Sequence, residues 1–208
     1  MISVMNDSTD GPVSGTAPPT PTSAAVPPPE LIDLPGGYQL RRRTLADVPA
    51  VNAVIVRNID HLRPWMPWAT EVPSLARTAE MTKAGWQLWE DRTDFLYVLS
   101  HQAEPGSVLG MFGLHRRVGP GALEIGYWIA KEYTGRSLAT NGAAALTEAA
   151  LALPDVDRVE IHCDQANAAS AAVPRKLDYR LDRVVERVPA APAETGQKLI
   201  WIKERAGC

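Results

Sequence analysis

The sequence has few residues that could hold a metal ion or a disulfide framework. It contains two cysteines, Cys163 and Cys208, and four scattered histidines among 208 residues. Two cysteines are too few for a disulfide-stapled domain or a four-cysteine zinc site, and the histidines lack ligand spacing. We therefore expect neither a structural nor a catalytic metal.

Long apolar runs and an excess of positive charge are also missing. No segment approaches the roughly 20 apolar residues of a membrane helix, and the N-terminus lacks the basic start and apolar stretch of a signal peptide. The formal net charge of −3 offers no electrostatic footprint for nucleic acid. We expect a cytoplasmic protein with neither a membrane nor a nucleic-acid partner.

Residues 1–36 differ in composition from the rest of the chain. They hold eight of the 18 prolines and four acidic residues, but no lysine or arginine. Such a segment cannot bury enough apolar surface to offset the entropy lost on ordering. The sequence predicts a disordered proline-rich extension over 1–36 and one folded domain over 37–208, which is nearly neutral.

The hydrophobic pattern of residues 37–208 predicts alternating strands and helices. Thr44 and Asp47 resemble a capping box before the first helix, and Ser74 can cap the second. The expected elements are a strand at 38–41, helices at about 48–63 and 74–90, strands at 95–100, 108–114 and 123–129, a helix at about 136–153, a strand at 158–163, a short helix from Asn167, and strands at 179–188 and 198–203. This order predicts an α/β (α+β) fold with a mixed sheet and helices on its faces.

The segment from Leu123 to Thr140 passes from a strand through a loop of small residues into a helix. The strand places Glu124, Gly126 and Trp128 on the face opposite Tyr127. In the loop that follows, backbone N–H groups converge with the positive end of the helix, an arrangement that suits a pyrophosphate. A simple tight turn is the alternative, and the Gly-Lys-Ser/Thr ending of a P-loop is absent.

Four segments together resemble the GNAT acetyltransferase superfamily, and within it the RimJ/RimL-type N-acetyltransferases. They are His61–Trp68, Glu124–Ile129, Thr134–Ala139, and Asp164–Ser170 leading to Lys176–Tyr179. The resemblance runs from about Tyr38 to the C-terminus. It implies a mostly antiparallel central sheet with helices on both faces, in which the strands 123–129 and 158–163 splay apart.

The resemblance also implies an acetyl-CoA site between these two strands. The strand edge that pairs with pantetheine would be supplied by Tyr127, Trp128 and Ile129. The residues implied to cradle the pyrophosphate are Arg136, Ser137, Leu138, Ala139 and Thr140. Asn167 would border the pantetheine and Ser170 would protonate the departing thiolate, although both residues also suit a helix cap.

The loop departs from the family pattern Gln/Arg-x-x-Gly-x-Gly/Ala at Thr134 and Ser137. A serine is expected to fit there only if its φ is negative. Asp178-Tyr179 replaces the usual Gly-Phe, and aspartate tolerates a left-handed turn position better than most residues.

Acetyl transfer to an ammonium group requires a base, and Glu124 is the first candidate, acting directly or through water. Partial burial is expected to raise its pKa, whereas the alternative is a structural carboxylate paired with an arginine. His115 could be a base, an acceptor contact or a solvated strand end, and Glu186 and Glu194 are further candidate bases. A backbone N–H near Trp128 or Ile129 is expected to stabilise the oxyanion.

Trp65 and Trp68 stand on a proline-stiffened connection between the first two helices. They could border the acceptor entrance, as the family resemblance implies, or simply roof the core. Cys163 fits a small core residue better than a nucleophile.

The sequence thus predicts an acetyl-CoA-dependent N-acetyltransferase that acts by direct transfer in a ternary complex. The acceptor would be a primary amine: a protein N-terminal α-amine, or the amine of a metabolite or antibiotic. The rival hypothesis is a CoA-binding sensor or interaction module with impaired catalysis, which the departures at Thr134 and Ser137 favour. The identity of the acceptor and the choice between monomer and homodimer stay open.

Overall fold

The computed structural model describes residues 26–205, which form one eight-stranded sheet with helices on both faces. The strand order is β1-β2-β3-β4-β5-β6-β8-β7. The strands are β1 (Leu31–Leu34), β2 (Tyr38–Arg42), β3 (Asp94–His101), β4 (Gly110–His115), β5 (Ala122–Ile129), β6 (Arg158–Asp164), β7 (Arg180–Glu186) and β8 (Gln197–Glu204). Within the described chain only β5 and β6 pair in parallel, so the mixed, mostly antiparallel sheet is confirmed.

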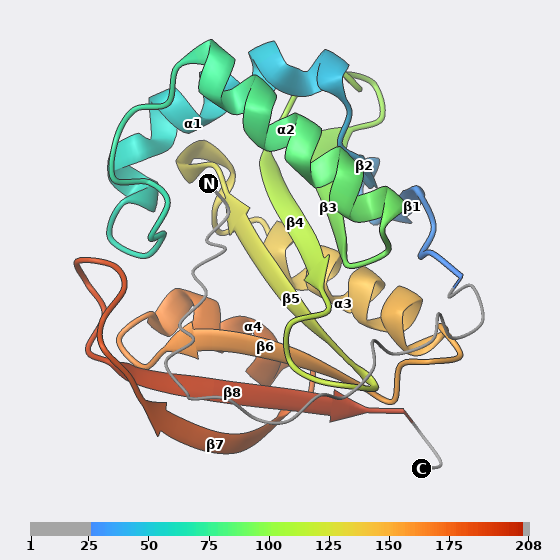
Figure 1. The fold of residues 1–208 in the computed structure, drawn as a ribbon, viewed down its shortest axis with the longest axis vertical. Helices are drawn as coiled ribbons and strands as arrows, with labels where there is room; N and C mark the ends of the chain where they lie inside the picture. The colour runs from blue at the N-terminus through green and yellow to red at the C-terminus, as the bar shows by residue number, and fades with distance from the viewer. Residues whose placement is uncertain (1–25, 206–208) are drawn as a thin grey trace, which may run out of the picture.

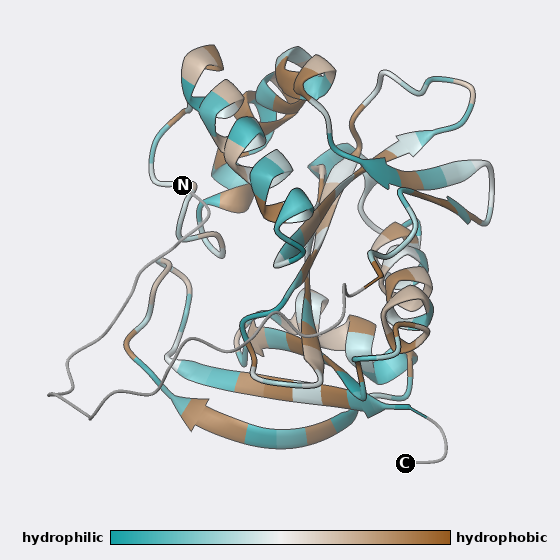
Figure 2. Cartoon of the chain, turned by 45° about the vertical axis from the view of Figure 1, so that its right-hand side comes forward, coloured by the Kyte–Doolittle hydropathy of each residue, from teal (hydrophilic) through white to brown (hydrophobic). Residues whose placement is uncertain are grey.

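The helices lie on opposite sides of the central strands (Figures 1 and 2). They are α1 (Val48–Leu62), α2 (Leu75–Glu90), α3 (Leu138–Leu151) and α4 (Ala168–Lys176), with 3-10 turns η1 (Leu45–Asp47) and η2 (Lys131–Tyr133). One apolar core includes α3, α4 and Ile125 of β5, and a second includes α1 and Trp128 of the same strand. Alternate residues of β5 therefore serve different cores, as the period of two predicts.

Local signals in the sequence account for the ends of the first two helices. The Asp47 carboxylate accepts the backbone N–H of Thr44 at 2.7 Å, which confirms the reciprocal cap before α1. Ser74 accepts the N–H of Arg77 at 3.1 Å and begins α2. The apolar face expected for the first helix is buried: Val48, Val51, Ile55, Ile59 and Leu62.

Strand β1 corrects the expectation that residues 1–36 are disordered. Leu31–Leu34 pairs antiparallel with β2. The turn that joins the two strands contains Gly36 and Gly37, which have positive φ angles of 81° and 77°. Leu34 is buried in the first core. A run of four residues is too short for its hydrophobic pattern to predict a strand. The strand is instead specified by its pairing with β2 in the folded sheet. The rest of that prediction, over residues 1–25, lies outside the described residues.

Strands β5 and β6 separate halfway along their length. Their pairing runs from Ala122↔Arg158 to Ile125↔Ile161. Beyond this point β5 stays paired with β4 to Ile129, while β6 stays paired with β8 to Asp164. The two strands consequently diverge, as Figure 1 shows for β5 rising away from β6. We call this opening the fork; it confirms the expected splay.

Among residues 26–205, no helix combines the length and the apolar character needed to cross a membrane. The same residues contain no cluster of three or more His, Cys, Asp or Glu side chains placed to hold a metal ion.

Candidate active site

The backbone of β5 has unpaired groups where it faces the fork. The Gly121 carbonyl accepts the N–H of Arg158 at 3.1 Å, and the Ala130 N–H donates to Leu109 at 2.8 Å. Backbone N–H and C=O groups alternate sides along a strand. Those of Tyr127 and Ile129 therefore point toward β6, and those of Trp128 point toward β4. The sequence offers two candidate oxyanion donors. This alternation favours the backbone N–H of Ile129 and argues against that of Trp128.

The loop after β5 turns sharply into α3. Gly135 and Ser137 both have positive φ, 74° and 59°, on either side of Arg136. The expectation of a negative φ at Ser137 is therefore wrong: its backbone is left-handed, which costs a residue with a Cβ roughly 1–2 kcal/mol. This turn brings successive N–H groups together at the start of α3, where the first N–H groups have no partner in the helix. Asp178 also has positive φ, 56°, as expected.

Within this loop, the residues expected at the pyrophosphate differ in how they are presented. Arg136 and Ser137 are exposed, whereas the side chain of Leu138 is buried and only its backbone can reach a ligand. Ala139 and Thr140 follow in the first turn of α3 and are half-buried. The Arg136 guanidinium lies over the ring of Tyr133, 5.1 Å from its centre. The loop thus presents backbone N–H donors at the surface, just beyond the C-terminal end of β5.

The start of α4 lies across the fork from β5. Asn167 accepts the N–H of Ser170 at 3.0 Å, so it caps the helix. The hydroxyl of Tyr127 is 3.3 Å from the Ser170 hydroxyl and donates to the Ser170 carbonyl at 3.1 Å. Burial raises the pKa of the nearby Cys163 thiol, so this cysteine is not activated as a nucleophile. Tyr127 and Ser170 are two hydroxyls placed together beside the free edge of β5.

The structure overturns the expected pKa of Glu124. Its carboxylate accepts two hydrogen bonds from the Arg117 guanidinium, at 2.8 and 2.9 Å. Burial acts to raise the pKa, but the Arg117 hydrogen bonds and the nearby His162 outweigh it and lower the pKa to about 2. Glu124 is the arginine-paired carboxylate that was the alternative reading, and it is ionised near neutral pH.

His115 is buried rather than solvated. It lies opposite Glu124 in the β4–β5 register and hydrogen-bonds through Nδ1 to the carboxylate of Asp94. A third carboxylate, that of Glu160, accepts from Nε2 of His162 at 2.6 Å. These side chains form a polar row across β3, β4, β5 and β6 on the face that also carries Trp128.

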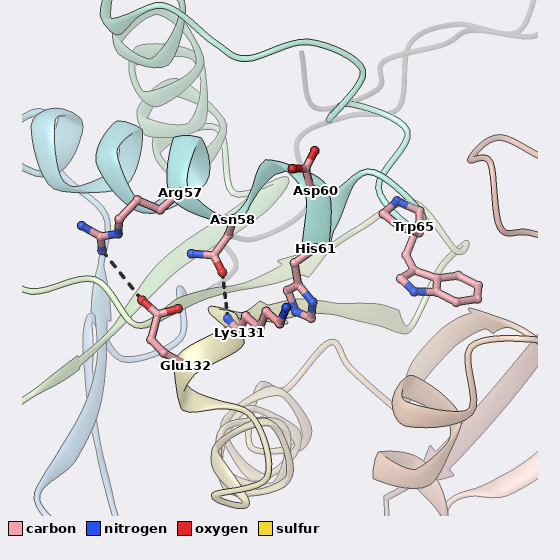
Figure 3. Close-up of a pocket in the computed structure, with 8 residues that line it drawn as sticks. Arg57, Asn58, Asp60, His61, Trp65, Lys131 and Glu132 are labelled. Carbon is pink, nitrogen blue, oxygen red and sulfur yellow. Dashed lines mark hydrogen bonds and ion pairs between the residues drawn. The ribbon is translucent and has the colours of Figure 1, made fainter.

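The two tryptophans of the α1–α2 connection have different surroundings. Trp68 packs against the second core, with its ring 6.4 Å from that of Trp128. Trp65 lines a pocket of about 830 Å³ between the end of α1 and η2. Figure 3 shows Asn58 and His61 of α1 facing Lys131 of η2 there, with Trp65 at one side. Trp68 therefore covers the core, while the acceptor role of Trp65 stays a prediction.

The connection between β7 and β8 meets the α1–α2 connection near the fork. The N–H of Ala193 donates to the Pro64 carbonyl at 3.0 Å. Glu194 pairs with Arg187 and accepts the N–H of Ala190 at 2.6 Å, so it holds this loop closed. Glu186 is an exposed strand end. Neither glutamate is arranged as a free base.

Sequence reasoning missed Arg117, Asp94 and the hydroxyl of Tyr127. Arg117 and Glu124 flank the turn at Gly119–Gly121, so hairpin pairing was the signal that could have joined them. Asp94 and His115 are register partners on β3 and β4, a relation that requires the pairing of the sheet to be known.

Comparison with known proteins agrees with this arrangement. The chain is similar to the Bacillus subtilis (strain 168) protein named "Putative ribosomal N-acetyltransferase YdaF", with 32% identity over 136 residues, covering 64% of this chain and 72% of YdaF. Two solved structures share the fold. RimL, a ribosomal L7/L12 alpha-N-protein acetyltransferase in complex with coenzyme A, matches with a TM-score of 0.77 and 21% identity, over 84% of this chain and 98% of RimL.

The second structure is the microcin C7 self-immunity acetyltransferase MccE in complex with acetyl-CoA and AMP. It matches with a TM-score of 0.76 and 16% identity, over 85% of this chain and 97% of MccE. Residues 39–180, which include the fork and the loop into α3, match the acetyltransferase (GNAT) domain family. With its forked sheet and this match over most of its length, the chain belongs to the GNAT acetyltransferase family.

Proposed function

We propose that this acetyltransferase moves the acetyl group of acetyl-CoA to a primary amine. One observation carries the proposal: the unpaired edge of β5 leads directly into the exposed N–H groups at the start of α3. The pantetheine arm of acetyl-CoA is an extended chain with amide groups, and a pyrophosphate follows it. A free strand edge suits the first part, and clustered N–H groups suit the second. CoA in RimL and acetyl-CoA in MccE support the same ligand here.

The residues of the fork fit the parts of acetyl-CoA. The backbone groups of Tyr127 and Ile129 would pair with the pantetheine amides as an added strand pairs. The N–H groups from Arg136 to Thr140, together with the helix dipole, would hold the pyrophosphate. Asn167 lies across the fork and would border the pantetheine. Because Ser137 adopts the left-handed turn despite its Cβ, the departure from the family pattern does not disrupt the loop, which weakens the hypothesis of an impaired sensor.

The chemistry that these residues support is direct transfer in a ternary complex. The Ile129 N–H would donate to the thioester oxygen as negative charge develops there. The hydroxyls of Ser170 and Tyr127 would supply a proton to the departing thiolate. Glu124 stays ionised beside Arg117, so its contribution is electrostatic and a different group must take the proton of the amine.

The acceptor is proposed to be the α-amine of a protein or peptide, with amine-bearing small molecules as the second class. The names of YdaF and RimL, which refer to ribosomal proteins, favour the first class, and the name of MccE, a microcin immunity acetyltransferase, favours the second. The connections that carry Pro64 and Ala193 meet beside the fork and would border the acceptor entrance, near Trp65 and Trp68.

Calorimetric titration with acetyl-CoA tests the cofactor site. Ser137→Asp places a carboxylate beside the proposed pyrophosphate, and Ser137→Asn is its neutral match; both residues tolerate left-handed backbone and favour helix caps. We expect Ser137→Asp to bind acetyl-CoA at least about 10-fold more weakly than Ser137→Asn, about 1.4 kcal/mol. Equal affinities would remove the loop from the site.

The reaction itself is tested by thiol release with a panel of peptides and small amines, and by mass spectrometry of the products. We expect an acetylated primary amine from at least one member. Binding of acetyl-CoA without turnover on the panel would favour the sensor hypothesis. No binding of acetyl-CoA would contradict both hypotheses.

A further inference from the structure

Two glycines leave a recess in the face of the sheet at the fork, and the His115 ring fills it. A Cβ built on Gly113 would lie 2.6 Å from Nε2 of His115, and one built on Gly126 would lie 3.3 Å from the same atom. Side chains at these positions would displace the ring. Nε2 therefore lies over Gly126, which is the first residue of β5 beyond its last pair with β6.

Asp94 holds the other side of the imidazole. Nδ1 of His115 is hydrogen-bonded to the Asp94 carboxylate, and the two residues are register partners on β3 and β4. A carboxylate on Nδ1 keeps the ring proton there and leaves Nε2 as an acceptor, an assignment that follows from this hydrogen bond. Within residues 26–205, no hydrogen bond joins Nε2 to another group, and the side chain keeps 9% of its surface exposed.

The distance from this nitrogen to the proposed thioester position suits an amine. The Ile129 N–H, proposed to hold the thioester oxygen, lies nearly three residues beyond Gly126, or roughly 9 Å along the strand. A base within about 3 Å of the amine nitrogen, and that nitrogen within about 3 Å of the carbonyl carbon, span about 6 Å. The C=O bond and its hydrogen bond to the Ile129 N–H extend this span to roughly 10 Å. An acceptor nitrogen fits between His115 and a carbonyl held by Ile129.

We propose that His115, positioned by Asp94, is the general base that deprotonates the acceptor ammonium; this inference rests on the proposed acetyl transfer. The N–H bond breaks and its proton moves to Nε2. The electron pair left on nitrogen forms the bond to the carbonyl carbon, and the C–S bond breaks with its electrons on sulfur. The Ser170 or Tyr127 hydroxyl protonates the thiolate and is reprotonated by the second proton that the nitrogen loses as the amide forms. The imidazolium returns its proton to solvent.

The neighbouring titratable groups are engaged elsewhere. The charged side chains near the ring are Asp94 on β3, Arg117 after β4 and Glu124 on β5, and the last two are paired with each other. His162 on β6 is the nearest competitor, since its buried Nδ1 has no hydrogen-bond partner among the described residues. That nitrogen faces Glu124 at 3.6 Å rather than the recess, so it is not placed to meet the amine.

The test measures kcat and KM of the full chain against pH, with acetyl-CoA and two acceptors. One acceptor is the peptide of the panel that gives the acetylated product, and the other is hydroxylamine, whose amine is neutral at pH 7. A missing base slows transfer to an ammonium far more than transfer to a neutral amine. We expect His115→Gln to lower kcat for the peptide about 100-fold or more, with a much smaller loss for hydroxylamine and unchanged affinity for acetyl-CoA.

Asp94→Asn gives a second, milder variant that preserves a hydrogen bond to the ring. We expect a smaller loss of kcat for the peptide, again exceeding the loss for hydroxylamine, because the imidazole loses the carboxylate that orients it. His101→Gln removes a half-buried histidine from the far end of β3 and should leave transfer to both acceptors unaffected.

Three results would overturn the assignment. They are wild-type kcat in His115→Gln, an equal loss with both acceptors, or a larger loss in His162→Gln than in His115→Gln. If the wild-type protein binds acetyl-CoA but acetylates no acceptor, the proposed function fails and the base fails with it. In contrast, an active His115→Gln variant contradicts the base alone.

Discussion

Glu124 occupies an apolar strand, where burial alone would raise the pKa of a carboxyl group. The two hydrogen bonds from Arg117 reverse this effect and hold the carboxylate in its charged form. A carboxylate with so low a pKa is a weak base near neutral pH. Its negative charge instead stabilises the positive charge of Arg117.

The low pKa of Glu124 predicts how stability depends on pH. Because its pKa falls from 4.5 to about 2 on folding, the stabilisation is complete above about pH 5 and is lost as pH falls toward 2. The shift corresponds to at most about 3 kcal/mol. Denaturant unfolding of the wild-type protein and Glu124→Gln at several pH values should show the difference narrowing with acid. A constant difference between pH 7 and pH 3 would contradict the pairing.

The alternation of β5 was predictable from single residues, whereas the partners of its polar side chains were not. A period of two assigns Glu124 and Trp128 to one face without any knowledge of the fold. The charge state of Glu124 depends on Arg117, and the orientation of His115 depends on Asp94 in a different strand. Such pairs form only when the strands align. The sequence alone therefore does not decide whether the Glu124 carboxylate is paired with an arginine or free to act as a base.

The connection between α1 and α2 places two tryptophans in different environments within four residues. Trp68 packs on Trp128 and the second core, while Trp65 lines the pocket at η2. Proline on this connection limits its freedom and holds both rings near the fork. The element thus combines a packing contact with the proposed surface for the acceptor.

Alanine substitutions should separate these two contributions. Trp68→Ala should lower the free energy of unfolding by about 2 kcal/mol, because it removes a half-buried ring from the core. Trp65→Ala should change stability little and raise the KM of the acceptor more than that of acetyl-CoA. Chemical denaturation and steady-state kinetics of both variants provide the measurement. Equal increases in both KM values for Trp65→Ala would indicate a folding role instead.

At the scale of the whole molecule, the order of elements and the mixed sheet followed from periodicity and turn residues. The fork was expected only from the family resemblance, because strand divergence depends on which residues stop pairing. Ser137 is a second feature that the sequence does not predict, because nothing about a serine indicates that it will adopt a positive φ. Contacts between distant segments decide both features, and a single sequence does not display them.

Strand β1 places the start of the folded domain before residue 37. Leu34 is buried, the hydroxyl of Tyr97 donates to the Pro29 carbonyl at 2.8 Å, and Glu30 pairs with Arg42 at 2.7 Å. A chain that begins at residue 37 loses all three contacts and the pairing with β2. Burial of one leucine alone stabilises a protein by about 2 kcal/mol.

We therefore expect a chain of residues 37–208 to be at least about 2 kcal/mol less stable than one of residues 26–208. Urea unfolding of both chains measures the difference. Leu34→Ala in the longer chain separates the buried side chain from the strand pairing. Acetyl-CoA affinity should match between the two chains, because β1 is at the opposite edge of the sheet from β7, with three strands between it and β5. Equal stability of the two chains would instead place the domain boundary at residue 37.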